Sequence, residues 1–154
     1  MPLIIRQYNK ADQDHIVELH VNGLNQFGAS IGDPALDKDI EQIEETYIHN
    51  NGEFLVGLQD NKVVCMGAFK KIDDETAEIK RIRIEREYQG RGIGGILLSE
   101  LEKSVRAKGY RRVVLDTTSR QVPAQKLFCR NGYTETGRRQ YKEMELIFYT
   151  KILE

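Results

Sequence analysis

The chain has 154 residues, of which 40% are hydrophobic and 31% are charged. This length and composition are typical of one globular domain and exclude a disordered or low-complexity chain. The formal net charge of −1 argues against a dedicated nucleic-acid-binding protein. We therefore expect residues 1–154 to form a single domain.

The N-terminal residues and the cysteines indicate the cellular environment. The apolar run near the N-terminus ends at Arg6, so it is too short for a signal peptide or a membrane span. We therefore expect a cytoplasmic protein with no membrane partner. Cys65 and Cys129 are far apart, and the three histidines do not have the spacing of metal ligands. The sequence predicts reduced, buried thiols and no metal site.

The first third of the chain predicts a strand, two helices and a loop. Residues 3–8 have the composition of a strand, and Asp12 or Asp14 is the expected cap of the helix that follows. Glycine and proline residues predict a loop over 26–37. Apolar residues at helical spacing predict a second helix over 40–48.

The middle of the chain predicts an antiparallel sheet. Two alternating runs cover residues 53–60 and 62–72. The pair Asp60-Asn61 joins them, and such a pair is typical of a hairpin turn. A third strand, over residues 76–86, continues this series.

The third of these strands has an irregular apolar spacing. Its apolar positions are Ile79, Ile82 and Ile84, a step of three followed by a step of two. Because side chains alternate between the two faces of a strand, the extra residue indicates a β-bulge near Lys80 and Arg81. Bulges redirect side chains and separate neighbouring strands, so this one predicts an opening in the sheet.

The remainder of the chain predicts a helix, a strand, a second helix and a hairpin. An apolar helical face runs over residues 93–105, and a buried strand covers 111–118. Pro123 opens the second helix, and residues 133–139 and 143–153 form two more strands. This order of elements predicts an α+β fold with a mixed sheet. An exposed last strand would also favour a homodimer.

Charge and glycine are both unevenly distributed. Residues 1–79 carry a net charge of −9, and residues 80–154 carry +8. Near the start of the basic part, Gly90 to Gly95 contains four glycines directly before a helix. The unpaired N–H groups of a helix start attract an anion, above all where no side chain obstructs the approach. We therefore expect an anionic ligand here, and Arg91 adds a full positive charge.

A dinucleotide-binding fold is one alternative for these glycines. Gly90, Gly92 and Gly95 match G-x-G-x-x-G, and Asp116 follows 21 residues beyond Gly95. In that fold the first glycine directly follows a hydrophobic strand that begins a βαβ repeat, whereas the polar stretch 85–89 intervenes here. The sequence has no second mononucleotide-binding half, so its context disfavours this alternative.

A second interpretation accounts for nearly the whole chain. Gln89, Gly92 and Gly94 match Q-x-x-G-x-G, and residues 124–133, AQKLFCRNGY, are similar to a later A-x-x-L-Y-x-x-x-G-F segment. With both motifs in this order, the chain resembles the GNAT superfamily of acetyl-CoA-dependent N-acetyltransferases. The resemblance implies an α+β fold whose mixed, mostly antiparallel sheet has about seven strands, flanked by about four helices. It also implies that the bulged fourth strand is splayed from the fifth.

The resemblance implies a set of residues that bind acetyl-CoA. Backbone groups of the fourth strand would bind the pantetheine amides, the glycine loop would hold the diphosphate, and a residue at the head of the later helix would touch the cofactor. The implied residues are Ile82, Arg83, Ile84, Gln89, Gly90, Arg91, Gly92, Ile93, Gly94, Gly95 and Gln121.

Acetyl transfer to an amine requires a base, because an amine attacks only in its neutral form. Glu78, just ahead of the bulge, and Asp116, at the end of the fifth strand, are the candidates. The backbone N–H of Ile84 or a neighbour would stabilise the oxyanion. The usual general acid of the family is a tyrosine, and Phe128 occupies that position. Phenylalanine cannot donate a proton.

The substitution at Phe128 leaves two functions open. The first is an N-acetyltransferase that releases the CoA thiolate with water or with no acid, since a thiol pKa of about 8.5 makes a tolerable leaving group. Tyr133 and Tyr141 are alternative acids, and packing roles are the simpler interpretation of both. The second function is a catalytically impaired acyl-CoA-binding sensor or regulatory module.

The acceptor is expected to be a primary amine of a small molecule or a peptide. It would lie between the loop at 26–37 and the final hairpin, and the acidic part of the chain favours a cationic acceptor. The arginines of the basic part also suggest an RNA-binding protein, but no aromatic stacking motif accompanies them. The sequence therefore argues against a nucleic-acid partner.

Overall fold

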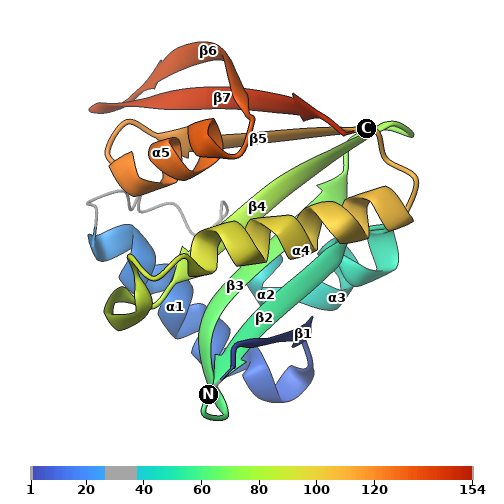
Figure 1. Ribbon diagram of the computed structural model, residues 1–154, viewed down its shortest axis with the longest axis vertical. Coiled ribbons are helices and arrows are strands. Elements are labelled where there is room, and N and C mark those ends of the chain that lie inside the picture. The colour runs from blue at the N-terminus through green and yellow to red at the C-terminus, as the bar shows by residue number, and fades with distance from the viewer. Residues whose placement is uncertain (1, 27–37, 154) are drawn as a thin grey trace.

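The computed structural model describes residues 2–26 and 38–153, which form a seven-stranded sheet with helices on both faces (Figure 1). The strands are β1 (Ile4–Gln7), β2 (Glu53–Gln59), β3 (Lys62–Lys71), β4 (Thr76–Ile84), β5 (Arg112–Thr118), β6 (Thr134–Tyr141) and β7 (Met144–Ile152). The helices are α1 (Gln13–Gln26), α2 (Lys38–Glu41), α3 (Ile43–Thr46), α4 (Ile93–Ala107) and α5 (Val122–Arg130). Short 3-10 turns are η1 (Lys10–Asp12), η3 (Ile48–Asn50) and η4 (Arg86–Tyr88).

The strand order is β1-β2-β3-β4-β5-β7-β6. All neighbouring strands are antiparallel except β4 and β5, which are parallel. The predicted mixed, mostly antiparallel sheet of about seven strands is therefore confirmed. Among the described residues, no helix is both long and apolar enough to span a lipid bilayer.

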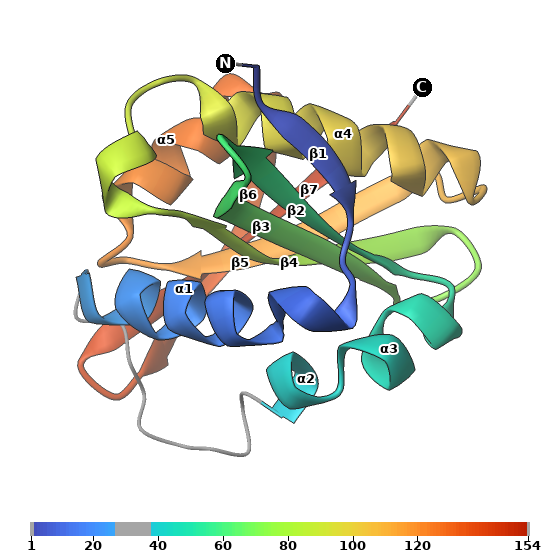
Figure 2. The ribbon, with the colours of Figure 1, turned by 90° about the horizontal axis from the view of Figure 1, so that it is seen from below.

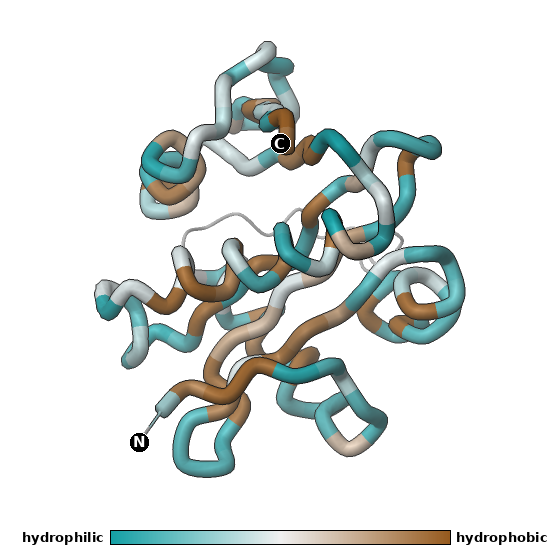
Figure 3. The backbone as a smooth tube through the Cα atoms, turned by 45° about the vertical axis from the view of Figure 1, so that its right-hand side comes forward, coloured by the Kyte–Doolittle hydropathy of each residue, from teal (hydrophilic) through white to brown (hydrophobic). Residues whose placement is uncertain are grey.

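The helices divide between the two faces of the sheet, and a separate core fills each side. Helices α4 and α5 cover one face, and α1, α2 and α3 lie on the other (Figure 2). The α4 face packs the larger core, around Leu97, Leu101 and Phe69, and the α1 face packs the smaller one, around Ile16 and Tyr47. Figure 3 shows hydrophobic segments along the central strands and hydrophilic loops at the periphery.

The start of the first helical segment differs from the prediction. The turn η1 leads directly into α1, and Asn9, rather than Asp12 or Asp14, caps this turn: its side chain accepts a hydrogen bond from the N–H of Ala11 at 3.0 Å. Asp12 lies at the third position and accepts from the N–H of Asn9 at 2.9 Å. The two residues form a capping box, in which the later carboxylate reaches back to the cap.

The predicted helix over 40–48 is also wrong, because three short segments, α2, α3 and η3, replace it. The break comes at Gln42, whose φ of −131° and ψ of 52° are not helical. Ile40, Ile43 and Tyr47 are all buried in the core beside the sheet. Their apolar spacing therefore reports burial and does not require one continuous helix.

Both hairpins form, and the second one corrects the expected sheet edge. Asp60 and Asn61 have φ values of 53° and 64°, which is the geometry of the predicted two-residue turn between β2 and β3. In the second hairpin, β7 lies between β5 and β6. The edge strand at this end of the sheet is therefore β6, and the prediction of an exposed last strand is wrong.

Candidate functional site

The predicted bulge interrupts β4 opposite Gly67 of β3. Lys80 pairs with Ala68 and Arg83 pairs with Met66, so two residues of β4 oppose the single Gly67. A β-carbon at Gly67 would lie 2.8 Å from Cδ1 of Leu101, so glycine is needed here for α4 to pack closely on the sheet.

Strands β4 and β5 separate soon after they begin to pair. Their register joins Thr76 to Arg112, Ala77 to Val113 and Glu78 to Val114. Both strands continue beyond these pairs, to Ile84 and Thr118, and they diverge in Figure 1. The splayed arrangement of the fourth and fifth strands is therefore confirmed.

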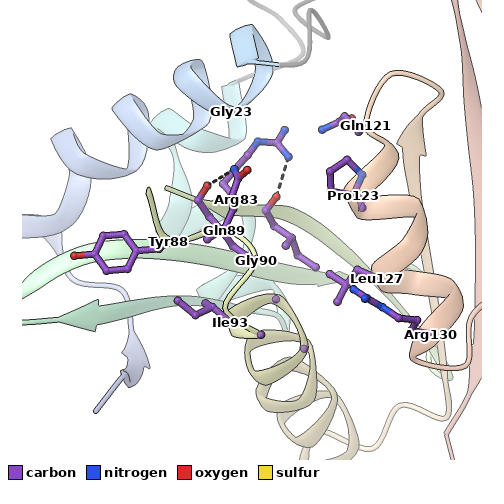
Figure 4. Close-up of a pocket in the computed structure, with 16 residues that line it drawn as sticks. Gly23, Arg83, Tyr88, Gln89, Gly90, Ile93, Gln121, Pro123, Leu127 and Arg130 are labelled. Carbon is purple, nitrogen blue, oxygen red and sulfur yellow. Dashed lines mark hydrogen bonds between the residues drawn. The ribbon is translucent and has the colours of Figure 1, made fainter. Parts of the chain in front are cut away.

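A pocket of about 190 Å³ lies between the diverging strand β4, the start of α4 and α5 (Figure 4). All the predicted cofactor residues except Arg91 line it: Ile82, Arg83, Ile84, Gln89, Gly90, Gly92, Ile93, Gly94, Gly95 and Gln121. Residues from two separate segments of the chain, before and after β5, thus meet at one site. Arg91 lies outside this lining, with its guanidinium 5.1 Å from the ring centroid of Tyr88.

The glycines of the loop serve different purposes. Gly90 and Gly92 have φ values of 77° and 82°, and a β-carbon on either would meet no atom within 4 Å. Packing does not require glycine at these two positions, whereas backbone conformation and open space favour it. At Gly94, in contrast, a β-carbon would lie 3.1 Å from Cδ2 of Leu127. Gly94 therefore allows α4 and α5 to approach each other.

The start of α4 faces this open space without a side-chain cap. Gly92 is the N-cap residue, and as a glycine it has no side chain to accept a hydrogen bond from the first turn. The N–H groups of a first helical turn have no partners within the helix and carry partial positive charge. The loop therefore presents hydrogen-bond donors to the pocket, which is the arrangement that binds phosphate oxygens.

Two side chains donate hydrogen bonds to backbone carbonyls at the end of β4. Nε2 of Gln89 donates to the carbonyl of Ile84 at 2.9 Å, and Nη1 of Arg83 donates to the carbonyl of Ile82 at 2.9 Å (Figure 4). The amide of Gln89 thus ties the loop to the strand that precedes it. On the opposite wall, Oε1 of Gln121 accepts hydrogen bonds from Thr117 and Thr118 at the end of β5.

The two candidate bases lie on the same face of the sheet, where β4 and β5 part. Val113 and Leu115 point into the core beside α4, so Asp116 points to the opposite face, as does Glu78, the partner of Val114. Neither carboxylate lines the pocket. Although Asp116 keeps contact with solvent, partial desolvation and the charge of Glu78 raise the pKa of its carboxyl.

The tyrosines near Phe128 have structural partners. Phe128 is buried, and its ring centroid lies 5.6 Å from that of Tyr149 and 5.9 Å from that of Tyr133. The hydroxyl of Tyr133 donates to Oε2 of Glu102 at 2.9 Å. Tyr133 is therefore a core residue. Tyr141 ends β6. Of the predicted acceptor loop over residues 26–37, Gln26 is the last residue of α1, and the rest lies outside the described residues.

Sequence reasoning missed six residues of the pocket lining: Gly23, Tyr88, Pro123, Ala124, Leu127 and Arg130. Ala124 and Leu127 belong to the second motif, and their helical spacing could have indicated a shared face. Gly23 comes from α1 and had no such signal. A β-carbon there would lie 2.6 Å from Cδ of Arg83, a contact that only the folded chain reveals.

The fold and this pocket define an acetyltransferase-like protein, and comparison with known families agrees. The model of the acetyltransferase (GNAT) family matches residues 20–133. The chain therefore belongs to the GNAT acetyltransferase family, and the resemblance noted from its two motifs is confirmed.

Individual relatives support the same assignment. The chain is 32% identical over 111 residues to N-acetyltransferase 8B of Homo sapiens, covering 68% of this chain and 49% of that protein. It thus spans about half the length of this curated relative. An acetyltransferase from Streptococcus agalactiae has a similar structure, with a TM-score of 0.87 at 26% identity over 98% of both chains. A GNAT acetyltransferase from Elizabethkingia anophelis, solved with acetyl-CoA bound, has a TM-score of 0.75 at 22% identity over 98% of both chains.

Proposed function

We propose that this protein is an enzyme that transfers an acetyl group from acetyl-CoA to a primary amine of a small molecule or a peptide. One observation carries the proposal: the uncapped start of α4 and its open glycines face a pocket beside the gap between β4 and β5. Membership of the GNAT family supports acetyl transfer as the reaction class.

The residues of the pocket fit a long, anionic acyl carrier. The N–H groups near Gly92 and Ile93 would bind the diphosphate, and the β4 backbone from Ile82 to Ile84 would bind the pantetheine amides. Leu127 and the ring of Pro123 provide an apolar wall on the α5 side. Acetyl-CoA, when bound, supplies an acetyl group activated as a thioester.

Asp116 and Glu78 would prepare the amine. An amine with a pKa of about 10.4 is neutral only about once in several thousand molecules at pH 7, so a nearby base increases the reactive fraction. The raised pKa of Asp116 makes it a better proton acceptor than an ordinary carboxylate. The base, directly or through water, would take the proton from the attacking nitrogen, and a backbone N–H at Ile84 would stabilise the oxyanion before the thiolate leaves.

An assay of CoA release across a panel of amines tests this function. The panel should contain free amino acids, their amides, polyamines and short peptides, and acetyl-CoA binding should be measured by calorimetry in parallel. We expect micromolar-range binding of acetyl-CoA and amine-dependent release of CoA. Binding of a nicotinamide dinucleotide without any binding of acetyl-CoA would contradict the proposal.

An acyl-CoA sensor is the second candidate, because Phe128 replaces the usual acid. Both candidates require acetyl-CoA binding, so only turnover separates them. Tight binding with no CoA release on any amine would favour the sensor. A cytoplasmic location and a homodimer remain predictions, to be tested by cell fractionation and by analytical ultracentrifugation.

A further inference from the structure

Arg81 occupies the bulge of β4 in a conformation that is costly for its residue type. Its φ is 61°, in the left-handed region, which costs a residue with a β-carbon about 1–2 kcal/mol. Such conformations persist when the surrounding structure holds them in place, and they are frequent at functional sites. We therefore expect the contacts of the Arg81 side chain to compensate for the cost of this backbone conformation.

Asp39 of α2 binds Arg81 in a bidentate ion pair. Nε of Arg81 lies 2.8 Å from Oδ2 of Asp39, and Nη2 lies 2.7 Å from Oδ1. Each side chain is only 13% exposed. The hydroxyl of the fully buried Tyr47 also donates to Oδ2 of Asp39. The bulge is thus tied to a core residue on the face opposite α4.

Asp39 is charged in this arrangement. Burial alone would raise the pKa of its carboxyl, but the hydrogen bonds and charge of Arg81 outweigh that effect and lower the pKa. Planar, bidentate arginine–carboxylate pairs restrict orientation more strongly than single hydrogen bonds do. The pair can therefore fix the backbone of Arg81 as well as its side chain.

The bulge determines which side chains face the pocket. Ile82 and Ile84 point toward α4 and line the pocket, as shown by the contacts that β-carbons at Gly67 and Gly94 would make with them. Because side chains alternate along a strand, removal of the extra residue from the pairing would turn residues 82–84 to the opposite faces. The same shift would redirect their backbone N–H and C=O groups.

We propose that Arg81 is a positioning residue: its ion pair with Asp39, backed by Tyr47, holds the bulge so that Ile82 to Ile84 are aligned for acetyl-CoA. This inference rests on the proposed function for one point, which is that the ligand is acetyl-CoA. Arg81 itself does not line the pocket. It acts through the conformation of the strand.

Two substitutions at one position separate positioning from stability. Arg81→Gly and Arg81→Ala both remove the guanidinium and leave the carboxylate of Asp39 without its ion-pair partner, so both variants should melt at a lower temperature. Glycine adopts a positive φ without the cost that alanine incurs. We expect the Kd for acetyl-CoA to rise up to about tenfold in Arg81→Ala and to stay within about twofold of the wild type in Arg81→Gly.

The measurements should be made by calorimetry at a temperature where circular dichroism shows both variants folded. In the amine assay, Arg81→Ala should raise the KM for acetyl-CoA and leave kcat nearly unchanged, which is the signature of lost uniform binding. Arg138→Ala is the matched control, because it removes an arginine of β6 that is paired with Glu135 on the same strand and with Glu145 on β7. Its Kd for acetyl-CoA should match that of the wild type.

Equal Kd values in the wild type, Arg81→Ala and Arg81→Gly would overturn the inference and leave the ion pair a purely stabilising contact. A wild type that does not bind acetyl-CoA would instead overturn the proposed function. Should Arg81→Ala not fold, Asp39→Asn provides the same test. It weakens the ion pair and keeps the side-chain shape, and we expect a two- to threefold rise in Kd, where no change would again overturn the inference.

Discussion

Gly92 illustrates how a single residue can indicate a ligand. It combines a positive φ with empty space where a β-carbon would stand, at the start of a helix that has no side-chain cap. A glycine required only by a tight turn needs the first property, whereas a backbone that approaches a bound molecule needs both.

We predict that Gly92→Glu abolishes measurable acetyl-CoA binding, because the new carboxylate occupies this space and repels the diphosphate. Calorimetry provides the measurement. Gly109→Glu is the control, since Gly109 has a φ of 92° and equally open surroundings but lies outside the pocket. Gly109→Glu places the same charged side chain at a positive φ, so it has the same conformational cost as Gly92→Glu. Loss of binding in both variants would attribute the effect to the fold and not to the loop.

Asp116 and Glu78 can be distinguished by pH dependence. Asp116 acts as a base only when deprotonated, and its raised pKa places the acid limb of the kcat/KM profile above the range of an ordinary aspartate. We predict that Asp116→Asn lowers kcat about 100-fold and removes this limb. Because Glu78 contributes to the raised pKa, Glu78→Gln should move the limb to lower pH. An unchanged limb in Asp116→Asn would exclude Asp116 as the base.

At the scale of elements, a buried carboxylate of α4 holds the β6–β7 end of the sheet. Glu102 accepts a hydrogen bond from Tyr133 at 2.9 Å and an ion pair from Lys151 of β7 at 3.0 Å. Glu102 is only 6% exposed to solvent. This contact holds β7 and the residue before β6 against α4.

We predict that Glu102→Ala lowers the free energy of unfolding by about 3–5 kcal/mol, because it leaves Lys151 and the Tyr133 hydroxyl without their partner. Glu100→Ala on the same helix removes only an exposed pair with Lys103 and should cost no more than about 1 kcal/mol. Urea unfolding of both variants provides the comparison. Similar losses would show that the buried network contributes no more than a surface pair.

The elements also show what the sequence could and could not predict. The spacing of Ile79, Ile82 and Ile84 was sufficient for the bulge, because alternation along a strand is a local property. Nothing near Arg81 indicated its pairing with Asp39, 42 positions earlier. The break at Gln42 was missed for a related reason, since burial in the shared core, not helical continuity, sets the spacing of its apolar neighbours.

Most of the pocket was predictable because two motifs of the sequence converge on it, one before β5 and one after. The contribution of α1, which is Gly23, could not be predicted from the sequence. Gly23 meets Arg83 only through the packing of the folded chain, and the identity of the acceptor depends on a side of the site for which the sequence contains no motif.

At the scale of the whole molecule, two aspartates outside the pocket make the free energy of unfolding depend on pH. Arg6 lowers the pKa of Asp12 through hydrogen bonds, and Arg81 lowers that of Asp39 against the effect of burial. A carboxyl with a lower pKa in the folded state stabilises the protein fully above its ordinary value of 3.8. That contribution disappears as the pH falls through the folded-state pKa.

We predict that the double variant Asp12→Asn/Asp39→Asn is less stable than the wild type at pH 7 and loses less stability on acidification below about pH 4. Urea unfolding across this pH range measures both quantities. An acid-induced loss as steep as that of the wild type would mean that other carboxylates dominate the transition.

The position of β7 in the sheet affects how this protein folds during translation. β5 pairs with β4 over three residues but with β7 along all seven of its residues, and β7 is translated after every other strand among the described residues. A nascent polypeptide therefore carries β5 without its main neighbour until residue 152 has emerged. Translation that stops after β6 would yield an assembled four-stranded half and exposed strand edges, which chaperones and proteases recognise.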